Sequence, residues 1–359
     1  MIKPTTSNSF TPELLYWYHH ESYDFPWRNT NNPYFIWISE VMLQQTRVAT
    51  VLPFYERWIT VMPNIKAVAD AHIDTLLKLW EGLGYYNRVR NFQKACILII
   101  EKHKGLVPGN YDDFSALPGV GSYISSAVMS IAFRLRHPAV DGNAIRVASR
   151  MNCIKKHYPK SITQTNAFLN KHIDPDNPGE FNQAIMDLGR EICTLRNPSC
   201  LSCPVQKYCS SYVNNTVDKY PLTKNSLPKP VYHVAVGIIW KKDQILISKR
   251  KDSGLLAGLW EFPGGKVKQG ENGTTCVVRE ALEELNVRII SETHIKQIKH
   301  TYSHFSIILD AYRCIYVGGA PRAIDCADFR WIYPSEIWRF AFPSASHKLF
   351  DKIDGASSS

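Results

Sequence analysis

The chain has 359 residues, with 42 Lys and Arg against 32 Asp and Glu, for a net charge of +10. This length predicts two or three domains, and the excess of positive charge is consistent with a nucleic-acid partner. No apolar run reaches the ~18 residues of a membrane span, and the N-terminus lacks the apolar core of a signal peptide. We therefore expect a soluble, intracellular protein of the bacterial cytoplasm or nucleoid, with no membrane association.

Two helices are predicted before residue 47. The run Thr11-Pro12-Glu13 has the order of an N-cap, a first-turn proline and a first-turn acid, which predicts a helix over residues 12–21. A second helix, over residues 34–46, carries Glu40 among apolar neighbours, with no Lys or Arg within four residues. This setting raises the pKa of a carboxyl, so Glu40 is a candidate general acid. The alternative is a solvated surface glutamate.

Helical periodicity continues from residue 48 to residue 106 and is interrupted by a glycine turn at residues 82–84. After this turn come two tyrosines and two arginines, namely Tyr85, Tyr86, Arg88 and Arg90. Aromatic wedges beside cations are typical of loops that enter or prop open a duplex. Both tyrosines could equally belong to a helical core, and this alternative stays open.

A glycine-rich turn, Leu117-Pro118-Gly119-Val120-Gly121, precedes a run with apolar residues at helical spacing. The pattern predicts a tight hairpin that opens a helix. Glycines allow the backbone to approach a ligand closely, and the N–H groups of a first helical turn bind anions, so this turn is a candidate site for a DNA phosphate. An ordinary turn between helices is the alternative.

One acid stands alone in a cationic stretch. Asp141 is the only acid between residues 133 and 160, where seven Lys and Arg occur. Such a field favours an anionic polymer and predicts that Asp141 stays ionised. The run Asp141-Gly142-Asn143 also has the composition of a turn and a helix N-cap, and that structural alternative stays open.

Four cysteines crowd one loop after the last predicted helix of the N-terminal half, at Cys193, Cys200, Cys203 and Cys209. The spacing C-x6-C-x2-C-x5-C provides four thiolates, which suit either tetrahedral zinc or a [4Fe-4S] cluster. The odd total of nine cysteines argues against a secreted disulfide framework, and the other five are expected to be core thiols.

A connector separates the two halves of the chain. Residues 214–230, after a helical domain over residues 1–213, contain few large apolar residues and three prolines, which predicts an interdomain linker. The periodicity then changes from helical to alternating. Residues 231–240 and 244–250 predict a β-hairpin, the start of an α+β domain over residues 231–359.

The C-terminal domain contains an acidic motif. From Gly265 to Val287 the chain follows the pattern G-x5-E-x7-R-E-A-x-E-E-x-N-V, whose charged members are Glu271, Arg279, Glu280, Glu283 and Glu284. This is nearly a complete Nudix box. Asn286 replaces the glycine, and asparagine also tolerates a left-handed helix C-cap. The glutamates repel one another, which a divalent cation or an arginine would relieve, so Mg²⁺ binding and nucleotide hydrolysis stay open.

These motifs occur in a familiar order. Helix, LPGVG hairpin, helix and VDGN resemble the endonuclease III superfamily of helix-hairpin-helix DNA glycosylases, over about the first two thirds of the chain. The cysteine spacing is similar to the cluster loop of that superfamily, which implies a [4Fe-4S] cofactor. With its second domain the whole layout resembles the MutY family, adenine DNA glycosylases that act on adenine mispaired with 8-oxoguanine. The implied fold is multidomain: an all-α glycosylase domain with the hairpin at about residues 112–133 and the cluster loop at 193–209, followed by an α+β Nudix-like domain.

The resemblance implies roles for matching residues. Glu40 would be the general acid and Asp141 the catalytic aspartate, with Tyr123 and Asn143 as their helpers. Adenine release is similar to glycoside hydrolysis, in which protonation makes a leaving group and an anion stabilises the cationic sugar. The DNA-binding candidates, from this likeness and from the hairpin and wedge segments, are Arg28, Gln45, Tyr85, Arg88, Gly119, Gly121 and Ser122.

Recognition of 8-oxoguanine is implied for Tyr302, Ser303 and His304, which resemble the family's F-S-H loop. Oxidation makes guanine N7 a hydrogen-bond donor, so an acceptor such as Ser303 can prefer the oxidised base. The expected partner is duplex DNA containing adenine opposite 8-oxoguanine, bound by a monomer that flips the adenine out of the stack. Contacts with downstream repair proteins stay open.

Two rival activities remain. A bifunctional glycosylase and lyase of the endonuclease III type needs a lysine amine for a Schiff base, and no lysine occurs from residue 105 to residue 154. This absence favours a monofunctional glycosylase, a hydrolase of N-glycosyl bonds. The second rival is a Nudix pyrophosphohydrolase whose helical half tethers it to DNA.

Overall fold

The chain folds into two compact units in a computed structural model that describes residues 9–21, 23–223 and 228–353. The helical unit comprises residues 1–70 and 91–226, and the sheet unit comprises residues 71–90 and 227–359. The sequence predicted a single boundary at a linker, whereas residues 71–90 of the helical half cluster with the C-terminal residues. Residues 224–227 of that predicted linker lie outside the described residues.

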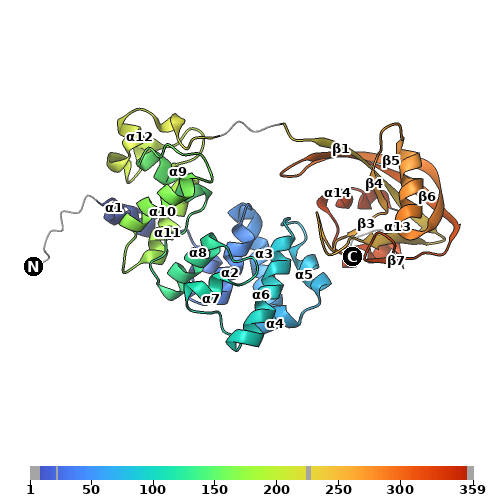
Figure 1. Cartoon of the computed structure of the whole chain (residues 1–359), viewed down its shortest axis with the longest axis horizontal. Helices are drawn as coiled ribbons and strands as arrows, with labels where there is room; N and C mark the ends of the chain where they lie inside the picture. Colours follow the sequence, from blue (N-terminus) through green and yellow to red (C-terminus); the bar gives the residue numbers. More distant parts are fainter. Residues whose placement is uncertain (1–8, 22, 224–227, 354–359) are drawn as a thin grey trace, which may run out of the picture. The chain divides into compact units, whose positions relative to one another are not determined.

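The helical unit contains eight longer helices, which are α1 (Thr11–His20), α2 (Pro33–Leu43), α3 (Val48–Val61), α6 (Asn87–His103), α8 (Ser122–Phe133), α9 (Gly142–Met151), α10 (Ser161–His172) and α11 (Pro178–Asp187). Its shorter helical segments are η1 (Pro26–Arg28), α4 (Ile65–Asp70), α7 (Tyr111–Ser115), η2 (Leu188–Ile192), η3 (Cys200–Ser202), η4 (Gln206–Tyr208), α12 (Ser210–Val213) and η5 (Val217–Lys219). Figure 1 shows α1, from the start of the chain, beside α10 and α11.

The ends of the first two helices differ from the sequence prediction. Thr11 was expected to cap α1, but the N-cap is Phe10, and the Thr11 hydroxyl donates to the carbonyl of His172 over 2.7 Å. Helix α2 ends at Leu43 instead of Thr46, and Gln45 adopts a positive φ of 56° in the turn that follows. Gln44 is therefore the C-cap residue of α2, not a helical neighbour of Glu40.

Helix α2 lies at the centre of the helical unit. Eight of its eleven residues are buried, because α2 packs against both α3 and α8. Trp37 of α2 contacts Phe92 at a ring-centroid distance of 4.4 Å and Phe114 at 5.3 Å. A helix that is apolar on all sides is stable only when other helices cover it, and α2 therefore carries Glu40 into a dry interior.

The predicted hairpin lies between α7 and α8. Gly119 adopts a φ of 77°, and a Cβ atom at this position would lie 2.7 Å from the Cβ of Asn91. Glycine is thus required both by the backbone conformation and by the close approach of α6. Gly121 is the N-cap of α8, and no side chain caps the helix there.

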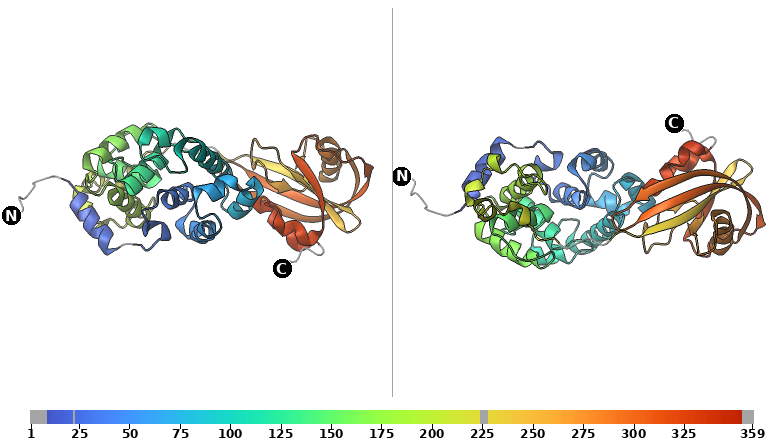
Figure 2. Two further views of the ribbon diagram at one scale, coloured as in Figure 1. Left: turned by 90° about the horizontal axis from the view of Figure 1, so that it is seen from below. Right: turned by 90° about the horizontal axis from the view of Figure 1, so that it is seen from above.

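The sheet unit is built on a seven-stranded mixed sheet with the order β3-β2-β1-β6-β5, to which β4 and β7 add by pairing with β1 and β2. The strands are β1 (Val231–Lys241), β2 (Gln244–Lys249), β3 (Trp260–Glu261), β4 (Gly264–Lys266), β5 (Val287–Thr301), β6 (Ser306–Gly319) and β7 (Asp328–Ile332). Its helices are α5 (Ile73–Trp80), α13 (Gly273–Leu285), η6 (Pro334–Arg339), α14 (Ser344–His347) and η7 (Phe350–Lys352). Figure 2 shows these strands side by side in the yellow to orange part of the chain.

The predicted β-hairpin is confirmed. Strands β1 and β2 pair antiparallel with Lys241 opposite Gln244, and the turn residue Lys242 has a φ of 56°. β1 also pairs with β6, in parallel, so it is covered on both edges. The expected left-handed C-cap is confirmed as well, because Asn286 ends α13 with a φ of 55°.

Among the described residues, no helix combines the length and the apolar character that crossing a bilayer requires.

Candidate active site

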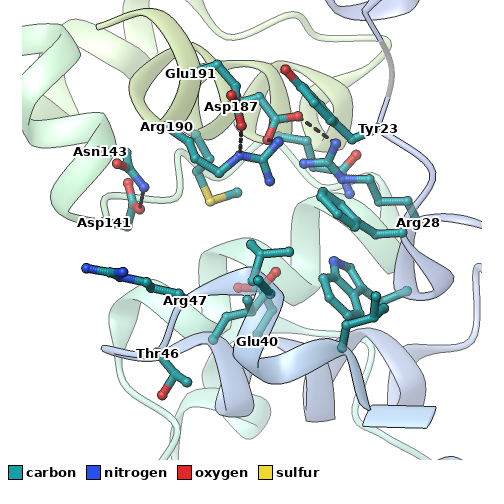
Figure 3. Close-up of a pocket in the computed structure, with 18 of the residues that line it drawn as sticks. Tyr23, Arg28, Glu40, Thr46, Arg47, Asp141, Asn143, Asp187, Arg190 and Glu191 are labelled. Atoms are coloured by element: carbon teal, nitrogen blue, oxygen red, sulfur yellow. Dashed lines mark hydrogen bonds and ion pairs between the residues drawn. The ribbon is translucent and has the colours of Figure 1, made fainter. Parts of the chain in front are cut away.

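A pocket of about 760 Å³ opens within the helical unit, lined by residues from η1, α2, the turn after α2, α8, α9, α11 and η2. Four of its lining residues were predicted to do the chemistry, namely Glu40, Tyr123, Asp141 and Asn143. In Figure 3, Asp141 and Asn143 lie on one side, Arg28 and Tyr23 on the other, and Glu40 between them. The fold therefore brings together groups that are about 100 residues apart in the sequence.

Glu40 is buried, with 5% of its surface exposed. Burial, with a smaller contribution from the charge of Asp141, raises the pKa of its carboxyl to about 7, while the hydrogen bond from Tyr123 and the charge of Arg28 oppose the shift. The Tyr123 hydroxyl donates to Glu40 Oε2 over 2.6 Å. The prediction of a raised pKa is confirmed, and its main cause is removal from water.

Asp141 is the N-cap of α9. Its Oδ1 accepts from the backbone N–H of Ala144 over 2.6 Å, and its Oδ2 accepts from the Asn143 side-chain amide over 2.8 Å. The predicted N-cap is confirmed, and Asp141 also lines the pocket.

The cationic stretch was predicted to keep Asp141 ionised, but burial has a larger influence on its pKa than the cations have. Burial raises the pKa of its carboxyl, and the hydrogen bonds from Ala144 and Asn143 oppose that shift more than the charge of Arg146 does. Only Arg146, of the seven cations counted in the sequence, is among the main influences on this pKa.

An ion pair forms another wall of the pocket. Arg28 donates to Asp187 Oδ2 over 2.5 Å, and both side chains are buried, with 12% and 3% of their surfaces exposed. Arg190 lies 3.1 Å from the other oxygen of Asp187 and packs over the ring of Tyr23, 4.4 Å from its centroid. Arg28, named from the family likeness as a DNA-binding candidate, thus lines the pocket.

The four clustered cysteines lie in the loop that follows η2. Burial, with smaller contributions from the other three thiols, raises the pKa of the Cys203 thiol to about 12, so the four sulfurs interact electrostatically. Arg150, which is 2% exposed, lies with its guanidinium 3.3 Å from Cys193 Sγ and donates to the carbonyls of Thr194 and Leu195. In the described part of the chain, no group of three or more His, Cys, Asp or Glu could hold a metal ion as arranged.

The remaining predicted residues lie outside this pocket. Gln45 is exposed in the turn after α2, and Gly119, Gly121 and Ser122 form the hairpin and the start of α8. The wedge residues Tyr85 and Arg88 and the loop residues Tyr302, Ser303 and His304 belong to the sheet unit, where all five line a second pocket of about 720 Å³. The Tyr85 and Ser303 hydroxyls are hydrogen-bonded there.

Relatives of known activity share most of this chain. The chain is 30% identical to the adenine DNA glycosylase of Rattus norvegicus and 31% identical to that of Mus musculus, covering 95% of this chain and 77% of each relative. It is 34% identical to the adenine DNA glycosylase of Buchnera aphidicola subsp. Baizongia pistaciae over 85% of this chain and 86% of that one. The chain belongs to the adenine DNA glycosylase family.

Family models and solved structures agree with that membership. Residues 38–172 match the HhH-GPD superfamily of base excision DNA repair proteins, and residues 235–352 match the NUDIX domain. A thermostable thymine-DNA glycosylase is 27% identical with a TM-score of 0.52, covering 57% of this chain and 95% of that one. Endonuclease III in a trapped covalent complex with DNA is 25% identical with a TM-score of 0.50, covering 57% and 94%. The predicted family, fold class and enzyme class are thereby confirmed.

In this adenine DNA glycosylase family member, the predicted acidic face of the Nudix box is neutralised by an arginine. Arg279 contacts Glu271 at 2.8 Å, Glu280 at 2.7 Å and Glu283 at 2.8 Å. Glu284 is not among these contacts of Arg279, and burial, with smaller contributions from Glu261 and Glu280, raises the pKa of Glu284 to about 8. Of the two ways to relieve the repulsion, a divalent cation or an arginine, the folded chain supplies the arginine.

Sequence reasoning missed one side of this pocket. Gln183, Met186, Asp187, Arg190 and Glu191 line it from α11 and η2. Their spacing places them on one face of a helix. A largely polar face on the helix just before the cysteine loop could have indicated this side of the pocket from the sequence. By contrast, no local pattern announces the pairing of Arg28 with a residue 159 positions away.

Proposed function

We propose that this adenine DNA glycosylase of base excision repair removes adenine lying opposite 8-oxoguanine, with Glu40 as the general acid and Asp141 as the anion that supports the cleaved sugar. One observation carries the proposal. Two carboxyl groups line the same pocket, one with a pKa of about 7 and the other held by two hydrogen-bond donors. Paired carboxyl groups in different environments are what acid-assisted cleavage of a glycosidic bond requires.

Glu40 is suited to protonate the base. A carboxyl with a pKa near 7 is partly protonated at neutral pH, which is the range where general acids are most effective. Because the Tyr123 hydroxyl donates to Oε2, the proton of neutral Glu40 is carried on Oε1. Tyr123 thus orients the acid and selects the oxygen that donates.

Asp141 is suited to stabilise positive charge on the sugar. Its two oxygens are already oriented by Ala144 and Asn143, so little reorganisation is needed when an oxocarbenium ion forms. Arg146 donates to Asn143 Oδ1 over 2.7 Å and thereby orients the amide that holds Asp141. Asn143 is accordingly a positioning residue for the aspartate.

The cysteine loop suits a [4Fe-4S] cluster. Each thiolate of such a cluster binds a different iron, so the four sulfurs need not converge on one point as they must around zinc. Cys193, Cys200, Cys203 and Cys209 would hold the cluster, and buried Arg150 would offset its negative charge. When bound, the cluster would supply cross-links that order the loop. The carbonyls of Thr194 and Leu195 are held by Arg150 in any case.

Recognition of the DNA is assigned to the exposed predicted residues. The uncapped first turn of α8, after Gly119 and Gly121, offers N–H groups to a phosphate. Gln45 and Tyr85, each with a positive φ, would fill the space left by the flipped adenine. The Ser303 hydroxyl would accept from N7–H of 8-oxoguanine, with Tyr302 and His304 shaping the loop around it.

A single-turnover assay tests this function. Duplexes with adenine opposite 8-oxoguanine, opposite guanine and in an undamaged A·T pair should be cleaved in that order of rate. Asp141→Asn should keep DNA affinity, since asparagine keeps the shape and the N-cap, but should lose base release by about a thousandfold. Exposed Glu56 of α3 supplies the control Glu56→Gln, which should match the wild type. Turnover retained in Asp141→Asn would refute the mechanism, and a borohydride-trapped adduct would indicate a lyase instead.

A further inference from the structure

Residues 71–90 are attached to the C-terminal residues of the sheet unit at both ends of α5. At its start, Asp74 pairs with Lys249 of β2 over 2.6 Å, with 31% and 14% of their side-chain surfaces exposed. Near its end, Lys78 donates to the carbonyl of Phe340 over 3.0 Å. The helix before the wedge loop is therefore held by the strands and loops of the sheet unit.

Glu81, the C-cap residue of α5, makes two contacts of this kind. Its Oε1 accepts from the backbone N–H of Phe342 over 2.7 Å and lies 2.8 Å from His347 Nε2. Its Oε2 accepts from Lys78 over 2.5 Å. The side chain is 13% exposed, and although burial alone would raise its pKa, the contacts with His347, Lys78 and Phe342 together hold the pKa below its usual value. Glu81 thus binds as an ionised, largely buried carboxylate with three partners.

A second attachment follows the wedge loop. Arg90 pairs with Asp252 over 2.9 Å and donates to the carbonyl of Ala257 over 3.3 Å. Gly258 has a φ of 70°, and a Cβ atom there would lie 1.7 Å from the Arg90 guanidinium. Residues 252–258 therefore pack tightly against Arg90. Residues 82–89 lie between two attached residues, Glu81 and Arg90.

Residues 82–89 are themselves held in one conformation. Gly82, Gly84 and Tyr85 have φ values of 106°, 70° and 50°. The Trp80 indole N–H donates to the carbonyl of Gly84 over 3.1 Å, and the Arg88 guanidinium donates to the same carbonyl over 3.0 Å. A left-handed tyrosine is costly and persists only where its surroundings hold it. The position of the Tyr85 hydroxyl against Ser303 depends on those surroundings.

We propose that Glu81 is a positioning residue that determines specificity: by joining the end of α5 to Phe342 and His347, it holds the Tyr85 loop against the Ser303 loop. This inference rests on the proposed reading of 8-oxoguanine by Ser303. Residues 82–89 belong to the helical half of the sequence, but the sheet unit then holds them in position. The base opposite the adenine contacts Tyr85 and Ser303 together, as one preformed surface. This surface favours 8-oxoguanine over guanine only while the Tyr85 loop and the Ser303 loop keep their relative position.

The test compares two mispairs. Single-turnover rates on adenine opposite 8-oxoguanine and adenine opposite guanine give a preference ratio for each variant. In Glu81→Ala the ratio should fall about fivefold or more, with the rate opposite guanine within about twofold of wild type. Glu81→Gln keeps an acceptor for the Phe342 N–H but loses the charge, so its ratio should lie between those of Glu81→Ala and wild type. Glu56→Gln, an exposed glutamate of α3, is the matched control.

A direct measurement of the contact accompanies the kinetics. Hydrogen exchange of the Phe342 amide should accelerate in Glu81→Ala and much less in Glu81→Gln, which also shows whether each variant is folded. An unchanged ratio in folded Glu81→Ala, or an equal loss on both mispairs, would overturn the positioning role. A wild-type enzyme without preference for 8-oxoguanine would overturn the proposed function itself, so the two failures are distinct.

Discussion

Two groups of glutamate and aspartate residues in this molecule are organised in opposite ways. In the pocket of the helical unit, Glu40 and Asp141 accept hydrogen bonds from Tyr123, Asn143 and the backbone, so the donors that hold them are neutral groups. On α13 of the sheet unit, Arg279 contacts three glutamates at once. The first arrangement gives one carboxyl a pKa of about 7, and the second pairs three carboxylates with one arginine.

The comparison shows that composition alone does not reveal what acidic residues do. Burial raises the pKa of Glu40 to about 7 and that of Glu284 to about 8, so each group contains one carboxyl near neutrality. In the pocket that carboxyl lies beside about 760 Å³ of open volume, where a base can reach it. A carboxyl with a shifted pKa can take part in catalysis only where a substrate can reach it.

The largest expected effect comes from removing the proton donor. Glu40→Gln cannot protonate adenine, and the rate of base release should fall by about 10²–10⁴. In the wild type the rate should decline as pH rises through about 7, because Glu40 loses its proton there. Single-turnover rates from pH 5 to 9 measure both. A wild-type rate that stays level through pH 8 would exclude Glu40 as the acid.

The second effect concerns the arginine of the Nudix box. Arg279→Met leaves Glu271, Glu280 and Glu283 without their common partner, so repulsion should lower the unfolding midpoint by about 5 °C or more. Calorimetry at neutral pH measures this change. Arg339→Met removes an exposed arginine of the same unit, with 77% of its side chain exposed, and should have little effect. Equal losses in the two variants would contradict the neutralising role.

The third effect is a gain of stability from the same substitution that abolishes activity. Because the folded-state pKa of Glu40 lies above its ordinary value of 4.5, ionising Glu40 costs stability, and the cost grows as pH rises from 4.5 to about 7. Glu40→Gln removes this cost and should be more stable than wild type by about 2–3 kcal/mol at pH 8. The difference should vanish near pH 4. Denaturant unfolding at the two pH values measures it, with Glu56→Gln as the exposed control.

The smallest effect sharpens the role of Tyr123. Its hydrogen bond lowers the pKa of Glu40, so Tyr123→Phe should raise that pKa and move the decline in rate to higher pH. The rate at the plateau should fall only about tenfold, since phenylalanine keeps the packing. A pH profile of single-turnover rates compares the two enzymes. A shift to lower pH would mean that Tyr123 does not donate to Glu40 in solution.

Local patterns in the sequence carried much of this structure. The isolated carboxyl at Glu40 indicated a raised pKa, the glycines at 119 and 121 indicated the hairpin, and Asn286 indicated a left-handed helix end. What could not be read depends on distance in the folded state. The charge environment of Asp141 was misjudged because counting cations along the chain ignores burial and hydrogen bonds. No local sequence pattern indicated that residues 71–90 belong to the sheet unit either, because the contacts of this segment reach residues 249 to 347.

Asp141 both caps α9 and lines the pocket. A substitution at this position can therefore change the stability of the protein, its activity, or both. Alanine or valine here removes a helix cap worth about 1 kcal/mol along with the chemistry, so cells would hold less of a dead enzyme. Under the proposed mechanism, asparagine would keep the helix cap and DNA binding but lose base release. The resulting protein would occupy lesions without clearing them, shielding damage from other repair, and would burden a cell more than losing the gene.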